Sequence, residues 1–210
     1  MKYPTTPRRI AFAALGMLVP LCVLAAMPAG ASRSSSVSEE QAGAARLIDA
    51  VMRDDLHALQ SLAGQGANLD ASVPGDGTAL IVASRRGDLA MVNTLLTLGA
   101  NVNAAVQGDG SALIAAASTG NINIMTRLLA AGARVDAITP DDETALISAV
   151  RSDRQAAVRL LVEHGADVNL GVLANGSQWR SPLNQSRSDE VRRYLLGRGA
   201  VAGSPQRAGG

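Results

Sequence analysis

The feature that most constrains the fold is an internal repeat with a period of 33 residues. The segment GDGTALIVAS begins at Gly75, GDGSALIAAA begins at Gly108 and DDETALISAV begins at Asp141. A Gly-Ala pair keeps the same period, and its glycines are Gly66, Gly99, Gly132, Gly165 and, one residue late, Gly199. Such a period is typical of arrays in which each unit buries its apolar side against its neighbours. The chain is therefore predicted to fold as about five stacked units.

Each unit has the pattern of two short helices joined by a turn. A hydroxyl that can cap the first helix stands at Thr78, Ser111 and Thr144, and the pattern Leu-Ile-x-Ala follows it. Apolar residues at helical spacing then mark a second helix, and the glycine of the Gly-Ala pair suits its end. Aromatic residues make up only 2% of a chain that is 47% hydrophobic, so we expect a core of Ala, Leu, Val and Ile. The predicted fold class is all-α, with hairpin-like finger loops between the units.

The two terminal units depart from this pattern, as the ends of a stack should. Arg192 occupies the place that Val92, Met125 and Val158 hold in the internal units, so its side chain is predicted to face solvent. The sequence Ser-Glu-Glu-Gln from Ser38 resembles a capping box and predicts where the first helix begins. The finger of the last unit is predicted to be longer than the others.

The N-terminal segment has the three parts of a secretory signal peptide, predicted over residues 1–31. Lys2, Arg8 and Arg9 are followed by an uncharged apolar stretch over residues 10–27, and Ala31 ends an A-x-A cleavage pattern before Ser32. The alternative is an uncleaved segment that anchors the protein in the inner membrane, since the stretch is just long enough to span. Pro20 and the small-residue site favour cleavage between Ala31 and Ser32.

Cysteine and charge content favour a bacterial periplasm as the location, with secretion as the alternative. The only cysteine, Cys22, lies in the predicted signal peptide, so the mature chain has neither disulfides nor a cysteine-based zinc site. The net charge of the whole chain is only +1, and basic and aromatic residues do not interleave. These features exclude nucleic acid as an expected partner.

The repeat pattern resembles the ankyrin repeat. The resemblance rests on the 33-residue period, the Thr-Ala-Leu-Ile start of the first helix, and the Gly-Ala-Asp-Val-Asn sequence before the next turn. It implies repeats over about residues 41–73, 74–106, 107–139, 140–172 and 173–201, with a linker at 32–40 and a disordered tail at 202–210. Ala79, Ala112 and Ala145 replace the proline of the family, and Ile81, Ile114 and Ile147 replace a histidine that normally hydrogen-bonds between repeats. Apolar packing is therefore expected to replace that polar link.

The last unit carries a narrower resemblance. Its sequence Gln-Trp-Arg-Ser-Pro-Leu, residues 178–183, follows a lengthened finger. This arrangement is similar to the ankyrin arrays attached to antirepressor-type, beta-lactam-sensing membrane zinc peptidases. The His-Glu-x-x-His helix of such a peptidase is missing from this sequence. The resemblance therefore covers the array without the peptidase.

Sequence motifs of catalysis are also missing, so the chain is predicted not to be an enzyme and to use no cofactor or metal. The glycine-rich turn from Gly75 to Thr78 lacks the lysine of a phosphate-binding loop and the acidic spacing of a calcium loop. The two histidines, His57 and His164, stand in the second helices of different units. The Arg86-Gly87-Asp88 tripeptide is interpreted as the turn between two helices rather than as an adhesion motif.

The resemblance implies that fingertips and the ends of the first helices form columns on a concave protein-binding face. Asp76, Asp109 and Asp142, with Glu143, are predicted to form an acidic row, and Arg85, Arg86, Ser118 and Arg151 to form a parallel row. Trp179 is the only tryptophan, and tryptophan is enriched at interface hot spots. The alternatives are that Asp-Gly only makes turns, that the arginines only solvate helix ends, and that Trp179 folds back on the last unit as a lid.

The predicted function is a non-catalytic scaffold that holds another protein, periplasmic or membrane-bound, on its fingers and concave face. The protein is predicted to be a monomer. One alternative is a sensor or regulatory module that signals to a membrane partner. The other is an exported effector.

Overall fold

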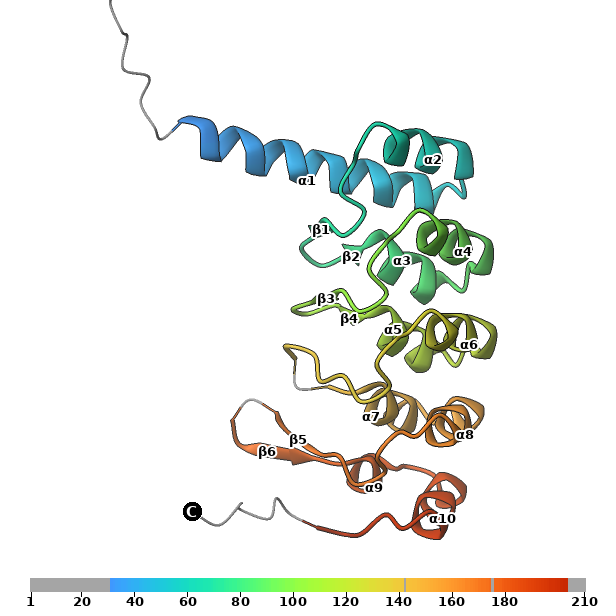
Figure 1. Ribbon diagram of the computed structural model, residues 1–210. Helices are drawn as coiled ribbons and strands as arrows, with labels where there is room; N and C mark the ends of the chain where they lie inside the picture. The colour runs from blue at the N-terminus through green and yellow to red at the C-terminus, as the bar shows by residue number, and fades with distance from the viewer. Residues whose placement is uncertain (1–30, 142, 175, 204–210) are drawn as a thin grey trace, which may run out of the picture.

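The computed structural model describes residues 31–141, 143–174 and 176–203. Five pairs of antiparallel helices stack along one axis, and the finger loops of successive units project to the same side (Figure 1). Residues 1–30 of the predicted signal peptide (1–31) and residues 204–210 of the predicted tail (202–210) lie outside the described residues. The expected all-α repeat stack is confirmed.

The helices form two layers. The inner layer, beside the fingers, contains α1 (Ala31–Met52), α3 (Ala79–Arg86), α5 (Ala112–Thr119), α7 (Ala145–Arg151) and α9 (Pro182–Gln185). The outer layer contains α2 (Leu56–Gly64), α4 (Leu89–Thr97), α6 (Ile122–Ala130), α8 (Gln155–Glu163) and α10 (Asp189–Gly197). Each inner helix contacts the inner helix of the next unit, from α1 through to α9 (Figure 1).

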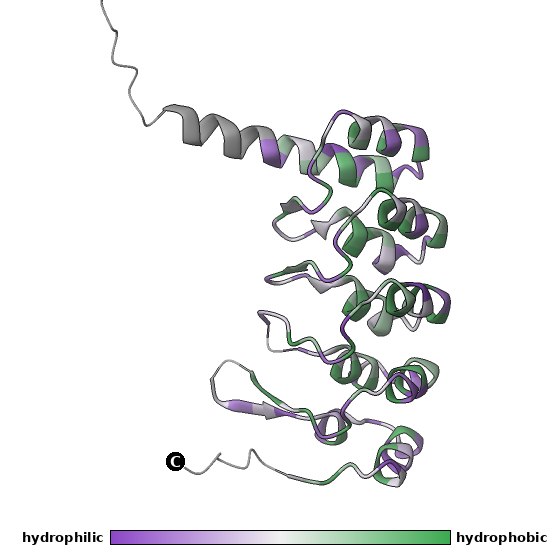
Figure 2. Ribbon diagram, viewed as in Figure 1, coloured by the Kyte–Doolittle hydropathy of each residue, from purple (hydrophilic) through white to green (hydrophobic). Residues whose placement is uncertain are grey.

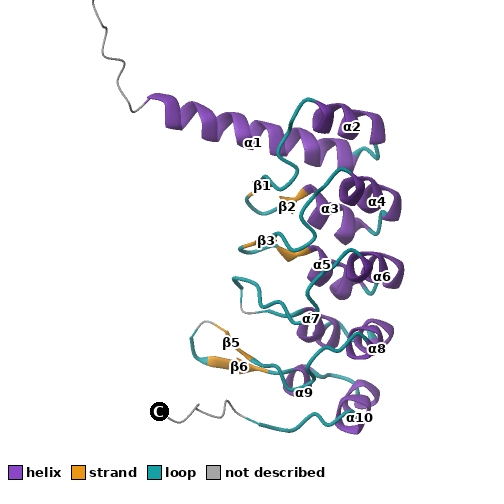
Figure 3. Cartoon of the chain, viewed as in Figure 1, coloured by secondary structure: helices purple, strands orange, loops and turns teal. Residues whose placement is uncertain are grey.

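Three of the four fingers are antiparallel hairpins (Figure 3). Their strands are β1 (Ser72–Val73) with β2 (Gly77–Thr78), β3 (Ala105–Val106) with β4 (Gly110–Ser111), and β5 (Val172–Ala174) with β6 (Gln178–Arg180). The third finger, in which residue 142 is not described, shows a single bridge between Thr139 and Glu143 among its described residues. The first and second fingers have glycine at the equivalent position, Gly77 with φ +85° and Gly110 with φ +72°. The third finger has Glu143 there. A glutamate rarely adopts that backbone conformation, which explains the missing hairpin.

The predicted helix caps are confirmed. The hydroxyls of Thr78, Ser111 and Thr144 accept hydrogen bonds from backbone N–H groups three residues on, at 3.3, 3.4 and 3.2 Å. The glycine of each Gly-Ala pair follows the last residue of a second helix and has φ between +83° and +95°. Asp54 and Asp153 take the same left-handed conformation at the turns within their units, where Gly87 and Gly120 stand in the second and third.

The core is one cluster of buried apolar residues contributed by both helix layers. Hydrophobic residues recur along the helices of both layers (Figure 2). The largest fully buried side chains of the core are leucine, isoleucine and methionine, among them Leu80, Leu95, Met125, Leu146 and Leu161. Small residues such as Ala83, Ala116 and Ala149 are fully buried, and they belong to inner helices that contact one another. The near-absence of aromatic residues is therefore matched by close helix stacking through alanine.

The first helix begins earlier than the sequence predicted. α1 runs without interruption from Ala31 to Met52, so the linker expected at residues 32–40 is helical and the capping box at Ser38 does not start a helix. Residues 31–42 are rich in serine and contain neither proline nor glycine. A helix held by packing at its C-terminal end can extend backwards through such a sequence, because each added residue needs no new nucleus.

A column of polar side chains links successive units, so apolar packing is not the only replacement for the missing histidine. Side chains that recur every 33 residues each accept a hydrogen bond from a backbone N–H of the next unit, at 2.8 to 3.1 Å. The pairs are Asp70 with Asn101, Asn103 with Arg134, Asp136 with Asp167, and Asn169 with Val201. This ladder supplies a polar connection at every junction from the first finger to the last unit.

Asn103→Ala is expected to lower the free energy of unfolding by about 1–3 kcal/mol. The Asn103 side chain accepts from the Arg134 N–H at 2.9 Å and donates from Nδ2 to the Gly132 carbonyl at 3.1 Å. Both bonds cross a junction between units, and the substitution removes both. Urea denaturation followed by circular dichroism measures the loss. Asn123→Ala, at an exposed position of α6, is the matched control, and a loss as large there would contradict the ladder.

Candidate protein-binding surface

The fingers and the C-terminal ends of the inner helices form one continuous side of the array, which we call the inner face. It contains the predicted residues Arg85, Arg86, Asp109, Ser118, Glu143 and Arg151, together with Arg180. Contacts between helix ends and finger bases hold it together. Arg85 at the end of α3 reaches Asp109 of the next finger, and Arg151 at the end of α7 reaches Glu143 of its own finger.

The three predicted acidic fingertips do not form an exposed row. Asp76 is exposed at its fingertip, but the side chain of Asp109 is only 5% exposed and accepts from Nη2 of Arg85 at 3.4 Å. Asp142 lies outside the described residues. Asp109 can turn inward because Gly77 has no side chain, and a Cβ built there would lie 3.1 Å from the Asp109 Cβ. The acid therefore supports an arginine of the preceding unit.

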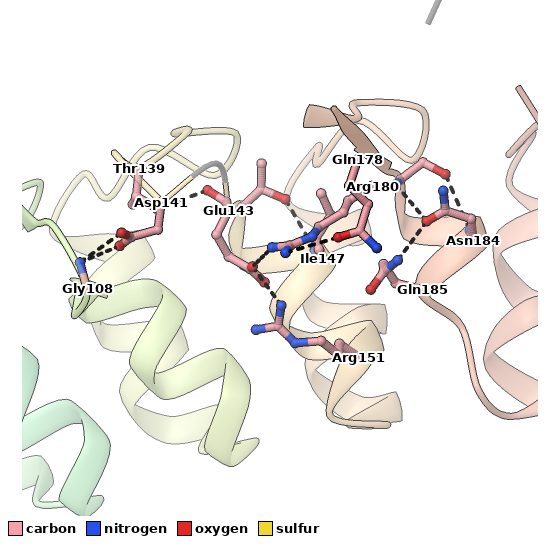
Figure 4. A network of polar contacts seen from close by, with 12 residues as sticks. Gly108, Thr139, Asp141, Glu143, Ile147, Arg151, Gln178, Arg180, Asn184 and Gln185 are labelled. Atoms are coloured by element: carbon pink, nitrogen blue, oxygen red, sulfur yellow. Dashed lines mark hydrogen bonds and ion pairs between the residues drawn. The ribbon is translucent and has the colours of Figure 1, made fainter. Parts of the chain in front are cut away.

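The acid that joins two fingertips is Asp141, which the sequence analysis did not single out. Both of its carboxylate oxygens lie 2.8 Å from the backbone N–H of Gly108, one finger earlier (Figure 4). This contact fixes the position of the third finger relative to the second.

Glu143 lies at the base of its finger, with 7% of the residue exposed. Its Oε2 accepts from Nη1 of Arg151 at 2.8 Å and lies 3.7 Å from Nη1 of Arg180 (Figure 4). Its Oε1 is buried, and no hydrogen-bond donor meets it among the residues that the structure describes. Sequence reasoning placed Glu143 and Arg151 on this face but missed Arg180. The available signal was position, because Arg180 precedes the cap hydroxyl Ser181 as Glu143 precedes Thr144.

The remaining inner-face residues have local roles. Arg86 donates to Asp54 of the first unit at 3.2 Å, and the Ser118 hydroxyl donates to the Ala115 carbonyl of its own helix at 2.8 Å. Arg85 and Arg86 also line an open, polar hollow of about 420 Å³ with Thr119, Asn121 and Asn123. This hollow lies at the junction of the second and third units.

Trp179 folds back onto the last unit. Its indole lies over Gly171, where an added Cβ would meet Cζ2 at 2.2 Å, and its Nε1 donates to the Gly203 carbonyl at 2.9 Å. Gly203 belongs to the short segment after α10, so the indole holds that segment against the long finger. This placement matches the lid alternative, in which Trp179 covers the end of the array rather than projecting from a fingertip.

Comparison with known families agrees with this geometry. A family model described as ankyrin repeats, in three copies, matches residues 47–139 and 105–171, which together are more than half of the chain. The chain belongs to the ankyrin-repeat family. A search of curated proteins finds no match to it.

The ankyrin array extends beyond the matched residues at its C-terminal end. α9 and α10 follow residue 171 and pack on α7 and on each other as a fifth unit. The inner helix of this ankyrin unit has only four residues, and the three-residue strands of its finger are longer than those before it. The predicted short, atypical terminal repeat is confirmed, and Arg192 on α10 is exposed as expected.

Within residues 31–141, 143–174 and 176–203 there is no group of three or more histidine, cysteine, aspartate or glutamate residues that could hold a metal ion. In the same ranges, no helix has both the length and the apolar composition to cross a bilayer. The apolar stretch at residues 10–27 lies outside these ranges.

Proposed function

We propose that this ankyrin array is a non-catalytic scaffold of the periplasm that holds a partner protein on its inner face. Ankyrin repeats are generally protein-interaction scaffolds, which fits the family of this chain. The observation that carries the proposal is the pairing of half-exposed arginines with buried acids. Arg85 and Arg151 are 45% and 39% exposed in their side chains, while their partners Asp109 and Glu143 are 5% and 9% exposed.

This arrangement prepares the arginines for binding. A guanidinium that is paired with a buried carboxylate has already lost part of its side-chain conformational entropy. Less entropy is therefore lost when a partner binds. Arginine is also one of the residues enriched at interface hot spots. The buried acids are therefore part of the binding surface even though a partner would not touch them.

The proposed location follows from the N-terminal sequence. A basic start, an apolar stretch and a small-residue site before Ser32 support export, and a cysteine-free mature chain suits the periplasm. The partner would then be a periplasmic protein or the periplasmic domain of a membrane protein. The likeness of the last unit to arrays on antirepressor-type membrane peptidases favours testing membrane proteins as well as soluble ones. The array would act as a monomer.

Capture of a partner from periplasmic extract tests the proposal. The variant Arg85→Ala/Arg86→Ala is expected to weaken capture roughly tenfold or more, because it removes two arginines of the inner face. Arg192→Ala/Arg193→Ala is the matched control, since it removes the same charge from the outer helix α10. Quantitative mass spectrometry of the captured proteins, with extracts that include solubilised membranes, measures both. Equal retention by the two variants would place the binding surface elsewhere.

A further inference from the structure

We infer that Arg151 and Arg180, held by Glu143, form a binding site for a carboxylate of the partner protein. The carboxylate would come from an aspartate or glutamate side chain or from a chain terminus. This inference rests on the proposed function, because it names the chemistry that the inner face recognises. It concerns one junction, between the fourth and fifth units, where α7 and β6 bring the two arginines together (Figure 4).

Among the described residues, the charges at this junction are not balanced. Two guanidinium groups approach the same oxygen, Oε2 of Glu143, at 2.8 and 3.7 Å. In the part of the chain that the structure describes, neither arginine has a second acidic partner within ion-pair distance. The other polar contact of Arg180 is the neutral Gln178 Oε1, at 3.5 Å from its Nη2. Counted over the described residues, one carboxylate therefore pairs with two arginines, which leaves an excess positive charge.

The excess charge is accessible while the acid is not. The side chains of Arg151 and Arg180 are 39% and 22% exposed, against 9% for Glu143. Each guanidinium has five N–H donors in a planar fork that fits a carboxylate, and the contacts with Glu143 leave most of them free. An incoming carboxylate would thus meet donors from two arginines before it could approach the buried glutamate.

The rest of the array shows that stacking does not require this cluster. The residue before the cap hydroxyl is Gly77 in the second unit and Gly110 in the third, and those junctions form without an ion pair at this position. In the fourth and fifth units the same position holds Glu143 and Arg180. A buried carboxylate is costly to desolvate, and within the described parts of the chain Oε1 of Glu143 has no hydrogen-bond donor. Placement of the two arginines for a ligand accounts for this arrangement.

Labelled peptides test the site on the full chain. Fluorescence anisotropy would compare three labelled peptides. The first contains internal glutamates and has an amidated C-terminus, and the second has the same sequence with glutamine in place of each glutamate. The third is the glutamine peptide with a free C-terminal carboxylate. We expect the first peptide, the third peptide or both to bind at least roughly tenfold more tightly than the second, amidated glutamine peptide. Preference for the first peptide identifies side-chain recognition, and preference for the third identifies chain-end recognition. Equal affinity for all three peptides overturns the inference.

Charge-matched variants show where the peptide binds. Arg151→Gln and Arg180→Gln are each expected to remove most of the carboxylate preference, whereas Arg193→Gln on the outer helix α10 should keep it. Equal loss in Arg193→Gln would indicate general electrostatic attraction and overturn the inference. Thermal unfolding followed by circular dichroism verifies that each variant is folded. If one inner-face variant fails to fold, the other and the wild-type peptide comparison still decide.

The outcome is separable from that of the proposed function. If the Arg85→Ala/Arg86→Ala variant loses its protein partner but neither carboxylate peptide binds more tightly than the amidated glutamine peptide, the scaffold function is supported and the carboxylate site is contradicted. If carboxylate peptides bind through Arg151 and Arg180 but no protein is captured, the carboxylate site is supported and the scaffold proposal is contradicted.

Discussion

Leu113→Ala is expected to lower the free energy of unfolding by about 2–5 kcal/mol. Leu113 is 3% exposed on α5, the inner helix at the centre of the array, and it belongs to the continuous apolar core. α5 contacts α3 on one side and α7 on the other. Because both neighbouring helices are held by their own contacts, they can close only part of the cavity that the substitution leaves. Urea denaturation with linear extrapolation measures the difference.

The matched control for this prediction is Arg192→Ala. Arg192 is exposed on α10, and its hydrogen bond is a 3.4 Å contact from Nη2 to the Ser186 carbonyl. Its removal should cost less than about 1 kcal/mol, as surface changes usually do. If the two variants lose equal stability, then Leu113 and Arg192 do not occupy interior and end positions of one stack, and the assigned repeat register is wrong.

The features that could be predicted from sequence are those that depend on residues close together in the chain. A cap hydroxyl three residues before its N–H donor, as at Thr78, is a local pattern, and so is a left-handed glycine after a helix, as at Gly99. The 33-residue recurrence then places such local patterns on a stack. This is why helix order, cap residues and the exposed Arg192 on α10 are correct without knowledge of any long-range contact.

The inner face could not be predicted in the same way, because its contacts join residues that are distant in sequence. Whether Asp109 is exposed depends on Gly77 and Arg85 of the preceding unit, and the sequence analysis treated it only as a fingertip. Glu143 turns inward because Arg151 and Arg180 meet it there. A register comparison would have aligned Arg180 with Glu143, yet it would not have shown that their side chains meet.

Val158→Arg is expected to cost more than about 4 kcal/mol, the range reached only by severe core changes. Val158 is 1% exposed on α8 and lines a small gap with Val191 and Tyr194 of α10. Arginine at this place would bury a charge between two outer helices. The nearby acid, Glu190, already lies 3.7 Å from Arg159 at the surface of the same junction. An unpaired charge in an apolar site is strongly destabilising because it loses its hydration without compensation.

The loss of stability caused by Val158→Arg should be confined to the C-terminal end of the array, because each unit contacts only its neighbours. Hydrogen exchange is expected to show lost protection in α8, α9 and α10 before α3 and α5. The reverse exchange, Arg192→Val, is the matched control and should change stability by less than about 0.5 kcal/mol, since no sixth unit covers that position of α10 in the structure described here. The two substitutions exchange the same residue types at equivalent repeat positions. A large difference between them would therefore measure the presence of a neighbouring unit, and similar small effects would show that α8 and α10 do not pack through Val158.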